Sequence, residues 1–340
     1  MIVSAATIRD RLRLYEDQAK KYADEAAANC GRISRSDSWR HQYLADPYLI
    51  GAPDERVAER FQQVFMNAMD LTEQGQIAPL PVGEPDSFML KFTHLLEEYG
   101  GRGGIPVPVV GEARKPLLAY FESGDPIAKT IFSGYSTPTS PFVVKYGRRE
   151  FLEPTFRTGR IRICPASYYN DTSHNAAVRD DELHRTFFIP THKERLKGVH
   201  HIDFQGHRIE FGDDDIVLPV LAPDYFLFSL CDHIYYRMPT DFGSDAAIVI
   251  RNPGLFVQRL ISSFLARWPD WEPEYGPVIY YDPYRDYTKV RIHEMSKHFG
   301  YAYQREVRII LRAKHAPRSS LQPEFLDLGP MTDYADLVSA

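Results

Sequence analysis

A stretch near the C-terminal end, residues 301–311, constrains the fold of this chain most strongly. It reads Y-A-Y-Q-R-E-V-R-I-I-L, and its alternation of side chains is typical of a β-strand. Gln304, Glu306 and Arg308 fall on one face of such a strand. Because an unpaired carboxylate is costly to bury, this face needs water or a ligand opposite it. The stretch predicts either a sheet edge with its polar face in solvent or a cleft wall that carries a catalytic carboxylate.

The composition is that of a globular protein with a substantial core. The chain has 340 residues, of which 44% are hydrophobic and 25% charged, and its formal net charge is -6. This length allows one large domain or two ordinary ones. No part of the sequence is strongly basic, so composition alone indicates no nucleic-acid partner.

The cysteines and the apolar runs bear on the compartment. Three cysteines, Cys30, Cys164 and Cys231, form no C-x-x-C pair, which argues against a disulfide framework and against a thiolate zinc site. No apolar run approaches the roughly 18 residues of a spanning helix, and the N-terminus lacks a basic segment followed by an apolar block. We therefore expect a cytoplasmic protein without a membrane partner.

The first 135 residues predict a helical domain. Helical periodicity begins at Ser4, and it recurs from Pro53 and over residues 88–99. The G-G-R-G-G segment that follows lacks the spacing of a phosphate-binding loop, so we interpret it as a flexible connector. A short extended piece at 106–110 and a short helix at 116–123 complete this part.

A segment rich in Ser, Thr and Pro, residues 134–141, is typical of a linker, and it places the boundary between domains 1–135 and 136–340. Beyond it, turns separate short runs of alternating or apolar residues, which predicts an α+β domain with a mixed sheet. Strands are expected at residues 142–146, 160–164, 208–211, 216–221, 225–231, 246–251, 278–281, 306–312 and 324–328, and helices at 254–268 and 289–298.

The order of several short motifs in the second domain resembles a known pattern. They are K-Y at 145–146, G-R-I-R-I-C-P at 159–165, Y-Y-N-D at 168–171, a strand with Ser229, and E-V-R-I at 306–309. A widespread family of uncharacterised bacterial domains has similar landmarks in this order. More remotely, the pattern is similar to the ADP-ribosyltransferase superfamily, which keeps a catalytic glutamate on a late strand. The resemblance covers about the last 200 residues.

The resemblance implies an ADP-ribosyltransferase-like fold and cleavage of the nicotinamide–ribose bond of NAD. Glu306 would correspond to the catalytic glutamate and hold a ribose hydroxyl, and Gln304 would orient a macromolecular acceptor. The superfamily usually presents His or Arg on its first strand, where this chain has Lys145 and Tyr146. A toxin or phage-defence context is expected. The NAD site would be completed by Tyr146, Tyr235 and Tyr236 against nicotinamide, Lys145, Arg160 and Arg162 near the pyrophosphate, and Asn170, Ser229 and Arg308.

Three other interpretations remain open. A non-catalytic module would use the same cleft to hold a nucleotide or a protein segment. A metal-dependent hydrolase or nuclease would use Asp171, Asp180, Asp181 and the histidines of residues 170–207, although H-E-x-x-H is absent. The simpler expectation for that segment is a mobile polar loop that acts as a lid or an acceptor-binding arm. Cys231 and His233 suggest a thiol nucleophile with its base, but residues two apart rarely reach each other, so a buried cysteine is expected.

Overall fold

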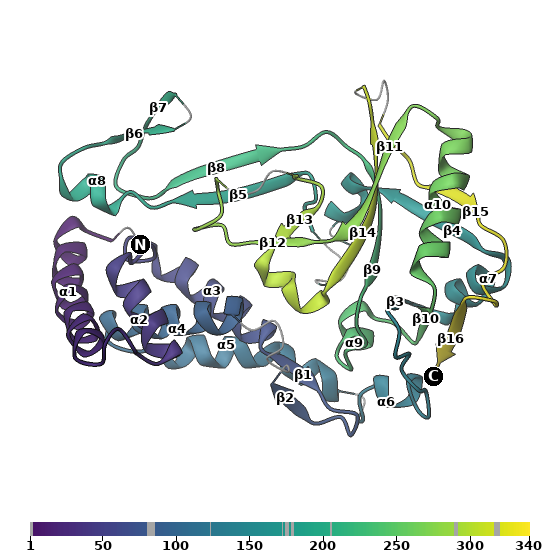
Figure 1. Ribbon diagram of the computed structural model, residues 1–340, viewed down its shortest axis with the longest axis horizontal. Helices are drawn as coiled ribbons and strands as arrows, with labels where there is room; N and C mark the ends of the chain where they lie inside the picture. The colour runs from purple at the N-terminus through teal and green to yellow at the C-terminus, as the bar shows by residue number, and fades with distance from the viewer. Residues whose placement is uncertain are drawn as a thin grey trace.

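The computed structural model describes residues 3–79, 86–122, 124–171, 173, 177, 180–204, 206–288, 292–315 and 320–340. It confirms a mixed α+β chain, with helices of the first part gathered beside a large sheet built by the second (Figure 1). The first part contains α1 (Ala5–Ala28), α2 (Arg35–Ala45), α3 (Asp54–Asn67), β1 (Met69–Leu71), β2 (Ile77–Pro79), α4 (Asp86–Gly101), α5 (Val107–Leu118), η1 (Ala119–Phe121) and α6 (Ala128–Ile131).

The second part supplies the rest of the elements. They are β3 (Val143–Gly147), α7 (Arg149–Thr158), β4 (Arg160–Pro165), η2 (Ala166–Asn170), β5 (His184–Ile189), α8 (His192–Leu196), β6 (His201–Phe204), β7 (His207–Glu210), β8 (Ile216–Leu221), β9 (Phe226–Cys231), α9 (Met238–Phe242), β10 (Ala246–Ile250), α10 (Pro253–Arg267), β11 (Trp271–Pro277), β12 (Ile279–Tyr281), β13 (Ser296–His298), η3 (Phe299–Gln304), β14 (Glu306–Ala313), β15 (Glu324–Asp327) and β16 (Ala335–Ser339).

The helices α1, α3 and α4 form where the periodicity predicts them. The Ser4 side chain caps α1 by accepting a hydrogen bond from the backbone N–H of Thr7. The expectation of an extended piece at 106–110 is wrong, because α5 begins at Val107. Prolines are tolerated in the first turn of a helix, where the missing N–H has no intrahelical partner. The G-G-R-G-G segment ends α4 and turns the chain, with positive φ at Gly103 and Gly104.

The main sheet has the strand order β11-β14-β9-β3-β10-β16, and β4 joins β9 to β15. Strand β9 pairs with β14 along one side, from Phe226 to Cys231. On its other side, Cys231 pairs with Val144 of β3, whereas Phe226 and Leu227 pair with β4. The strands β3 and β4 therefore pair with opposite ends of β9 and diverge next to its middle, so the sheet is split at this point.

The two faces of β14 differ, as the alternation predicts. Ile309 and Leu311 pack into a core with Phe256 and Leu260 of α10. Ile310 packs on the opposite face, where Glu306 and Arg308 also point. The hydrophobic face of the sheet is thus closed by a helix, and the polar face is left to the site described below.

Residues 301–305, the first part of the stretch 301–311, do not form a strand, so this expectation is wrong. Residues up to Gln304 form the 3₁₀ helix η3, and Arg305 has a positive φ of 44° before β14 begins. The side chain of Asn67 on α3 accepts a hydrogen bond from the backbone N–H of Tyr303 and donates to the carbonyl of Phe299. This contact with a helix distant in sequence holds the turn, and no local pattern encodes it.

Two further expectations are wrong. The described part of residues 289–298 is not helical, because it ends in β13, and residues 289–291 lie outside the described chain. The polar segment 170–207 is not one long loop, since β5, α8 and β6 lie in it. Strands β5 and β8 form a ribbon that reaches from the sheet over the helices toward α8 (Figure 1).

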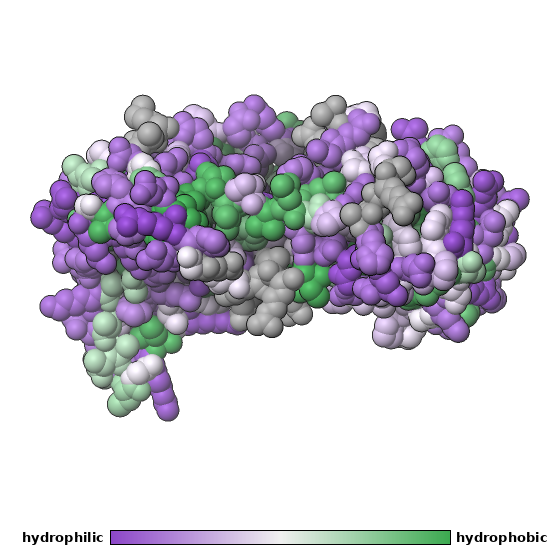
Figure 2. Space-filling view, turned by 90° about the horizontal axis from the view of Figure 1, so that it is seen from above, coloured by the Kyte–Doolittle hydropathy of each residue, from purple (hydrophilic) through white to green (hydrophobic). Residues whose placement is uncertain are grey.

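The surface of this ribbon is partly apolar. Seen from above, hydrophobic side chains gather over the middle of the molecule, where the ribbon runs (Figure 2). Val217 and Leu221 of β8 are 49% and 67% exposed. Among the described residues, no helix combines the length and the hydropathy that crossing a bilayer requires.

The two parts of the chain share a hydrophobic core. Tyr284 and Phe299 pack with buried side chains of α1 to α5. Beside them, the guanidinium of Arg60 on α3 donates to both carboxylate oxygens of Asp282, at 3.0 and 2.5 Å, and both side chains are buried. The helices therefore contact the second part through a core and a buried ion pair.

Candidate functional site

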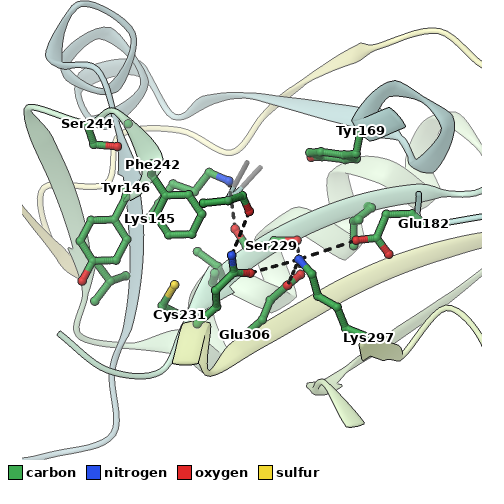
Figure 3. A pocket seen from close by; sticks show the side chains of 16 residues that line it. Lys145, Tyr146, Tyr169, Glu182, Ser229, Cys231, Phe242, Ser244, Lys297 and Glu306 are labelled. Carbon is green, nitrogen blue, oxygen red and sulfur yellow. Dashed lines mark hydrogen bonds and ion pairs between the residues drawn. The ribbon is translucent and has the colours of Figure 1, made fainter. Parts of the chain in front are cut away.

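A cavity of about 140 Å³ lies beside the split in the sheet (Figure 3). Its volume is close to that of an engineered protein cavity that binds benzene, so it has room for one aromatic ring. It is lined by Val144, Lys145, Tyr146, Gly147, Tyr169, Ala177, Glu182, Leu227, Ser229, Leu230, Cys231, Phe242, Ser244, Lys297, Gln304 and Glu306.

Glu306 is the most constrained acidic group of this cavity. One carboxylate oxygen, Oε1, accepts hydrogen bonds from the Ser229 hydroxyl at 2.5 Å and from Arg308 Nε at 2.7 Å. The other, Oε2, accepts from Lys297 Nζ at 3.0 Å. The residue is only 5% exposed, so it does not lie on an open sheet edge in bulk solvent.

These contacts keep Glu306 ionised. Burial alone would raise the pKa of its carboxyl, but the charges of Arg308 and Lys297 outweigh that effect and lower the pKa below its ordinary value. A carboxylate offers about four acceptor positions, and three of them are used by the donors named above. Among the hydrogen bonds of the described residues, Oε2 accepts the one from Lys297, which leaves it a second acceptor position for a donor such as a ligand hydroxyl.

A second carboxylate balances the same cations. Glu182 accepts from Arg308 at 2.6 Å and from Arg185 at 2.9 Å, and it is 2% exposed. Lys297 also lies 3.8 Å from Asp180, whose pKa burial raises to about 6. Buried cations and carboxylates thus meet in one network, which reduces the penalty for burying any one of them.

Gln304 reaches this network although it is not on the strand. Its Oε1 accepts from Lys297 Nζ at 3.1 Å, and its Nε2 donates to the carbonyl of Ala177 at 2.8 Å. The amide is therefore engaged at both ends. The prediction that Gln304 and Glu306 share a strand face is wrong, yet Lys297 joins the two side chains.

Strand β3 forms the opposite wall. Lys145 Nζ donates to the carbonyl of Ser229 at 2.9 Å, in the split beside β9. Tyr146 is 8% exposed, and its ring stacks on Phe242 with centroids 5.8 Å apart. Figure 3 shows Lys297 extended between Glu306 and Glu182, with the rings of Phe242 and Tyr169 on the other side of the cavity.

Of the eleven residues predicted for the site, five line the cavity: Lys145, Tyr146, Ser229, Gln304 and Glu306. Arg308 lies behind them, fully buried and bound to Glu306 and Glu182. Its role is thus to hold the carboxylates in place.

The other five predicted residues do not line the cavity. Arg160 and Arg162 are exposed on β4, where they stack over the rings of Phe325 and Tyr168. Asn170 is exposed and donates to Asp181 at 3.3 Å. Tyr235 packs on His233, and Tyr236 on Phe132. The motifs place these residues near the site in sequence, but their strand faces and turns direct them elsewhere.

Several lining residues escape the sequence reasoning. Lys297 lies in a segment expected to be helical, and a lone lysine gives no signal of its own. Tyr169 and Phe242 are ordinary aromatic residues in sequence, and the fold alone brings them to the cavity. Glu182 stands in the acidic run considered for a metal, and only its contact with Arg308 shows its place.

The described residues show no arrangement that supports the metal site or the thiol nucleophile. Within the described ranges, no three His, Cys, Asp or Glu side chains lie close enough to hold a metal ion; His174, one of the candidates, lies outside them. Cys231 is buried, and burial raises the pKa of its thiol. Its neighbours turn away from it, since Asp232 pairs with Arg305 and His233 packs on Tyr235.

Comparison with known proteins finds no match: no family model, no curated protein and no solved structure is significantly similar to this chain. The functional argument therefore depends on the cavity and its residues.

Proposed function

We propose that this protein cleaves the nicotinamide–ribose bond of NAD and transfers ADP-ribose to a macromolecular acceptor or to water. The observation that carries the proposal is an ionised glutamate at a cavity of ring size, whose Oε2 accepts a single hydrogen bond from the described residues. Glu306 supplies the carboxylate, and the cavity of about 140 Å³ has room for the nicotinamide ring. The split sheet and the order of motifs support an ADP-ribosyltransferase-like fold.

The reaction follows from these positions. The bond between ribose C1 and the ring nitrogen breaks, and its electron pair leaves with nicotinamide. The ribose develops positive charge, which the Glu306 carboxylate stabilises while it accepts a hydrogen bond from a ribose hydroxyl. A nucleophile of the acceptor, or water, then bonds to C1 of the ribose and releases its proton to solvent.

The neighbours of Glu306 act as positioning residues. Ser229, Arg308 and Lys297 fix both carboxylate oxygens and keep them ionised. Gln304 acts through Lys297, because its amide is already engaged at both ends. This role differs from the acceptor-orienting role expected from the resemblance.

Cavity size limits how the substrate enters. A whole dinucleotide needs a site of several hundred Å³, so only the nicotinamide end fits into about 140 Å³. The remainder of NAD lies outside, toward the open side of the cavity. For transfer to a macromolecule rather than to water, the proposed acceptor is a protein or a nucleic acid, which is consistent with a toxin or phage-defence role.

A pair of matched variants tests the proposal. Glu306→Gln removes the charge at the cavity. Glu274→Gln removes a partly exposed charge on the neighbouring strand β11, where Glu274 pairs with Arg312 of β14. Nicotinamide release from NAD should be lost in the first variant and kept in the second, with thermal unfolding measured for both. Equal release by wild type and folded Glu306→Gln would remove Glu306 from the mechanism.

A non-catalytic nucleotide-binding module is the second candidate. It is favoured by the three protein donors that already occupy Glu306, since a carboxylate so engaged also serves as a structural anchor. Calorimetry with NAD separates the two. Saturable binding without nicotinamide release by the wild type, with acceptor candidates present, would favour the module.

A further inference from the structure

Two lysines line the cavity, and they differ in their partners. Lys297 donates to Glu306 and Gln304 at 3.0 and 3.1 Å. Lys145 donates to the neutral carbonyl of Ser229 at 2.9 Å, and its ammonium lies 4.6 Å from the centroid of the Phe228 ring. Among the described residues, the ion pairs of 4.0 Å or less that involve either of these two lysines are those of Lys297 with Glu306, Asp180 and Glu182. Lys297 thus has a carboxylate partner that favours its charged form, whereas the hydrogen-bond acceptor of Lys145 is a neutral carbonyl.

The surroundings of Lys145 favour its neutral form. Burial lowers the pKa of its amine. The groups that face it and oppose this shift are the thiols of Cys231 on β9 and Cys164 on β4, and Glu306 on β14. For Lys297, burial also favours the neutral form, but Glu306 and its acidic neighbours outweigh it and raise the pKa. The cavity therefore contains one lysine with a lowered pKa, Lys145, and one lysine with a raised pKa, Lys297.

We propose that Lys145 is a reactive amine that captures a small, flat aldehyde or ketone as an imine within this cavity. The volume of about 140 Å³ admits one ring, and Phe242, Tyr169 and Leu227 provide apolar and aromatic walls for it. Lysines that are desolvated in a protein interior have a lowered pKa, and Schiff-base lysines are activated in this way.

The chemistry balances without a further reagent. The nitrogen lone pair of Lys145 bonds to the carbonyl carbon, and the carbonyl oxygen leaves as water with the two amine protons. No oxidant or reductant is needed, and the imine hydrolyses back to the amine. This activity requires neither NAD nor ionised Glu306, so it stands apart from the function proposed above.

The test uses the full chain and pyridine-3-carboxaldehyde, whose ring matches the cavity in size. Sodium cyanoborohydride reduces any imine to a stable secondary amine, and peptide mass spectrometry locates the label. At neutral pH we expect most of the cavity label on Lys145 and little on Lys297, because the pKa of Lys145 is lowered and that of Lys297 is raised. The pH midpoint of labelling at Lys145 should lie below that of the exposed Lys21.

Lys145→Arg provides the control, because it keeps a cation but cannot form an imine. This variant should lose the cavity label and keep labelling at Lys21. If Lys145→Arg does not fold, the ratio of Lys145 to Lys297 in the wild type decides by itself. Equal labelling of the two cavity lysines, or labelling of Lys21 without Lys145, would overturn the proposal.

Discussion

Replacing Glu306 by Gln should destabilise the fold as well as remove activity. The side chain is buried and accepts from Ser229, Arg308 and Lys297. Glutamine keeps the size of the side chain and one acceptor oxygen, but its amide nitrogen has to face a donor, either Arg308 or Lys297. In the variant, the buried cations Arg308 and Lys297 therefore lose the negative charge of one shared partner.

The size of the loss in unfolding free energy depends on the partners that Arg308 and Lys297 retain in the variant. Removing one partner of a buried ion pair costs about 3–5 kcal/mol. Arg308 retains Glu182 at 2.6 Å, and Lys297 retains Gln304 at 3.1 Å. We therefore expect a loss near the lower limit, about 3 kcal/mol. A domain with a typical unfolding free energy of about 5–15 kcal/mol would still fold.

Urea unfolding followed by tryptophan fluorescence measures this loss. Glu274→Gln is again the control, because Glu274 on β11 is a partly exposed partner of Arg312, which lies on β14 with Glu306. Such exposed pairs contribute about 0–1 kcal/mol. If the two variants lose the same small amount, the buried network does not stabilise the fold and the reasoning fails.

The pH dependence gives an independent check. The folded pKa of Glu306 lies below its unfolded value, because Arg308 and Lys297 outweigh the effect of burial. Its contribution is therefore complete above the unfolded pKa of about 4.3 and is lost as the pH falls toward the folded pKa. The stability gap between wild type and Glu306→Gln should be constant from pH 6 to 8 and should narrow below about pH 4. A gap that widens on acidification would contradict this sign.

Three other predictions concern the same chain. Gly159→Ala should lower the unfolding free energy by about 2 kcal/mol or more, because φ is 73° and the added Cβ would meet the Gly329 carbonyl; an unchanged urea midpoint would refute this. Arg60→Met leaves Asp282 buried without its cation and should cost about 3–5 kcal/mol; the double variant with Asp282→Asn should recover part of the loss, and no recovery would argue against the pair. Lys297→Met should raise the pKa of Glu306, because burial favours the neutral carboxyl and one opposing charge is gone; the acidic limb of nicotinamide release should move to higher pH, and an unmoved limb would count against this contact.

Sequence periodicity predicts the parts of the fold that depend on local alternation. The apolar stripes of α1, α3 and α10 and the alternation of β14 are visible in the chain because each buries one face. The prediction of a strand at the residues of η3 is wrong because their conformation depends on distant contacts. Their alternation imitates a strand, but the side chain of Asn67 on α3 and the positive φ of Arg305 impose a turn.

The candidate site follows the same division. Glu306, Ser229 and Lys145 are found because they lie on strands with a recognisable order of motifs. Lys297 is missed because its contact with Glu306 arises from a turn between two strands, and that turn has no local signature. Arg160 is misplaced because the exposed face of β4 carries it away from the cavity, against the ring of Phe325, whereas the other face of β4 packs into the hydrophobic core.

A structure of Glu306→Gln in complex with NAD tests the central claim most directly. The account predicts the nicotinamide ring inside the cavity, between the Lys145 wall and Phe242, with a ribose hydroxyl next to the side chain at position 306. A nicotinamide ring bound elsewhere, with this cavity empty, would contradict it.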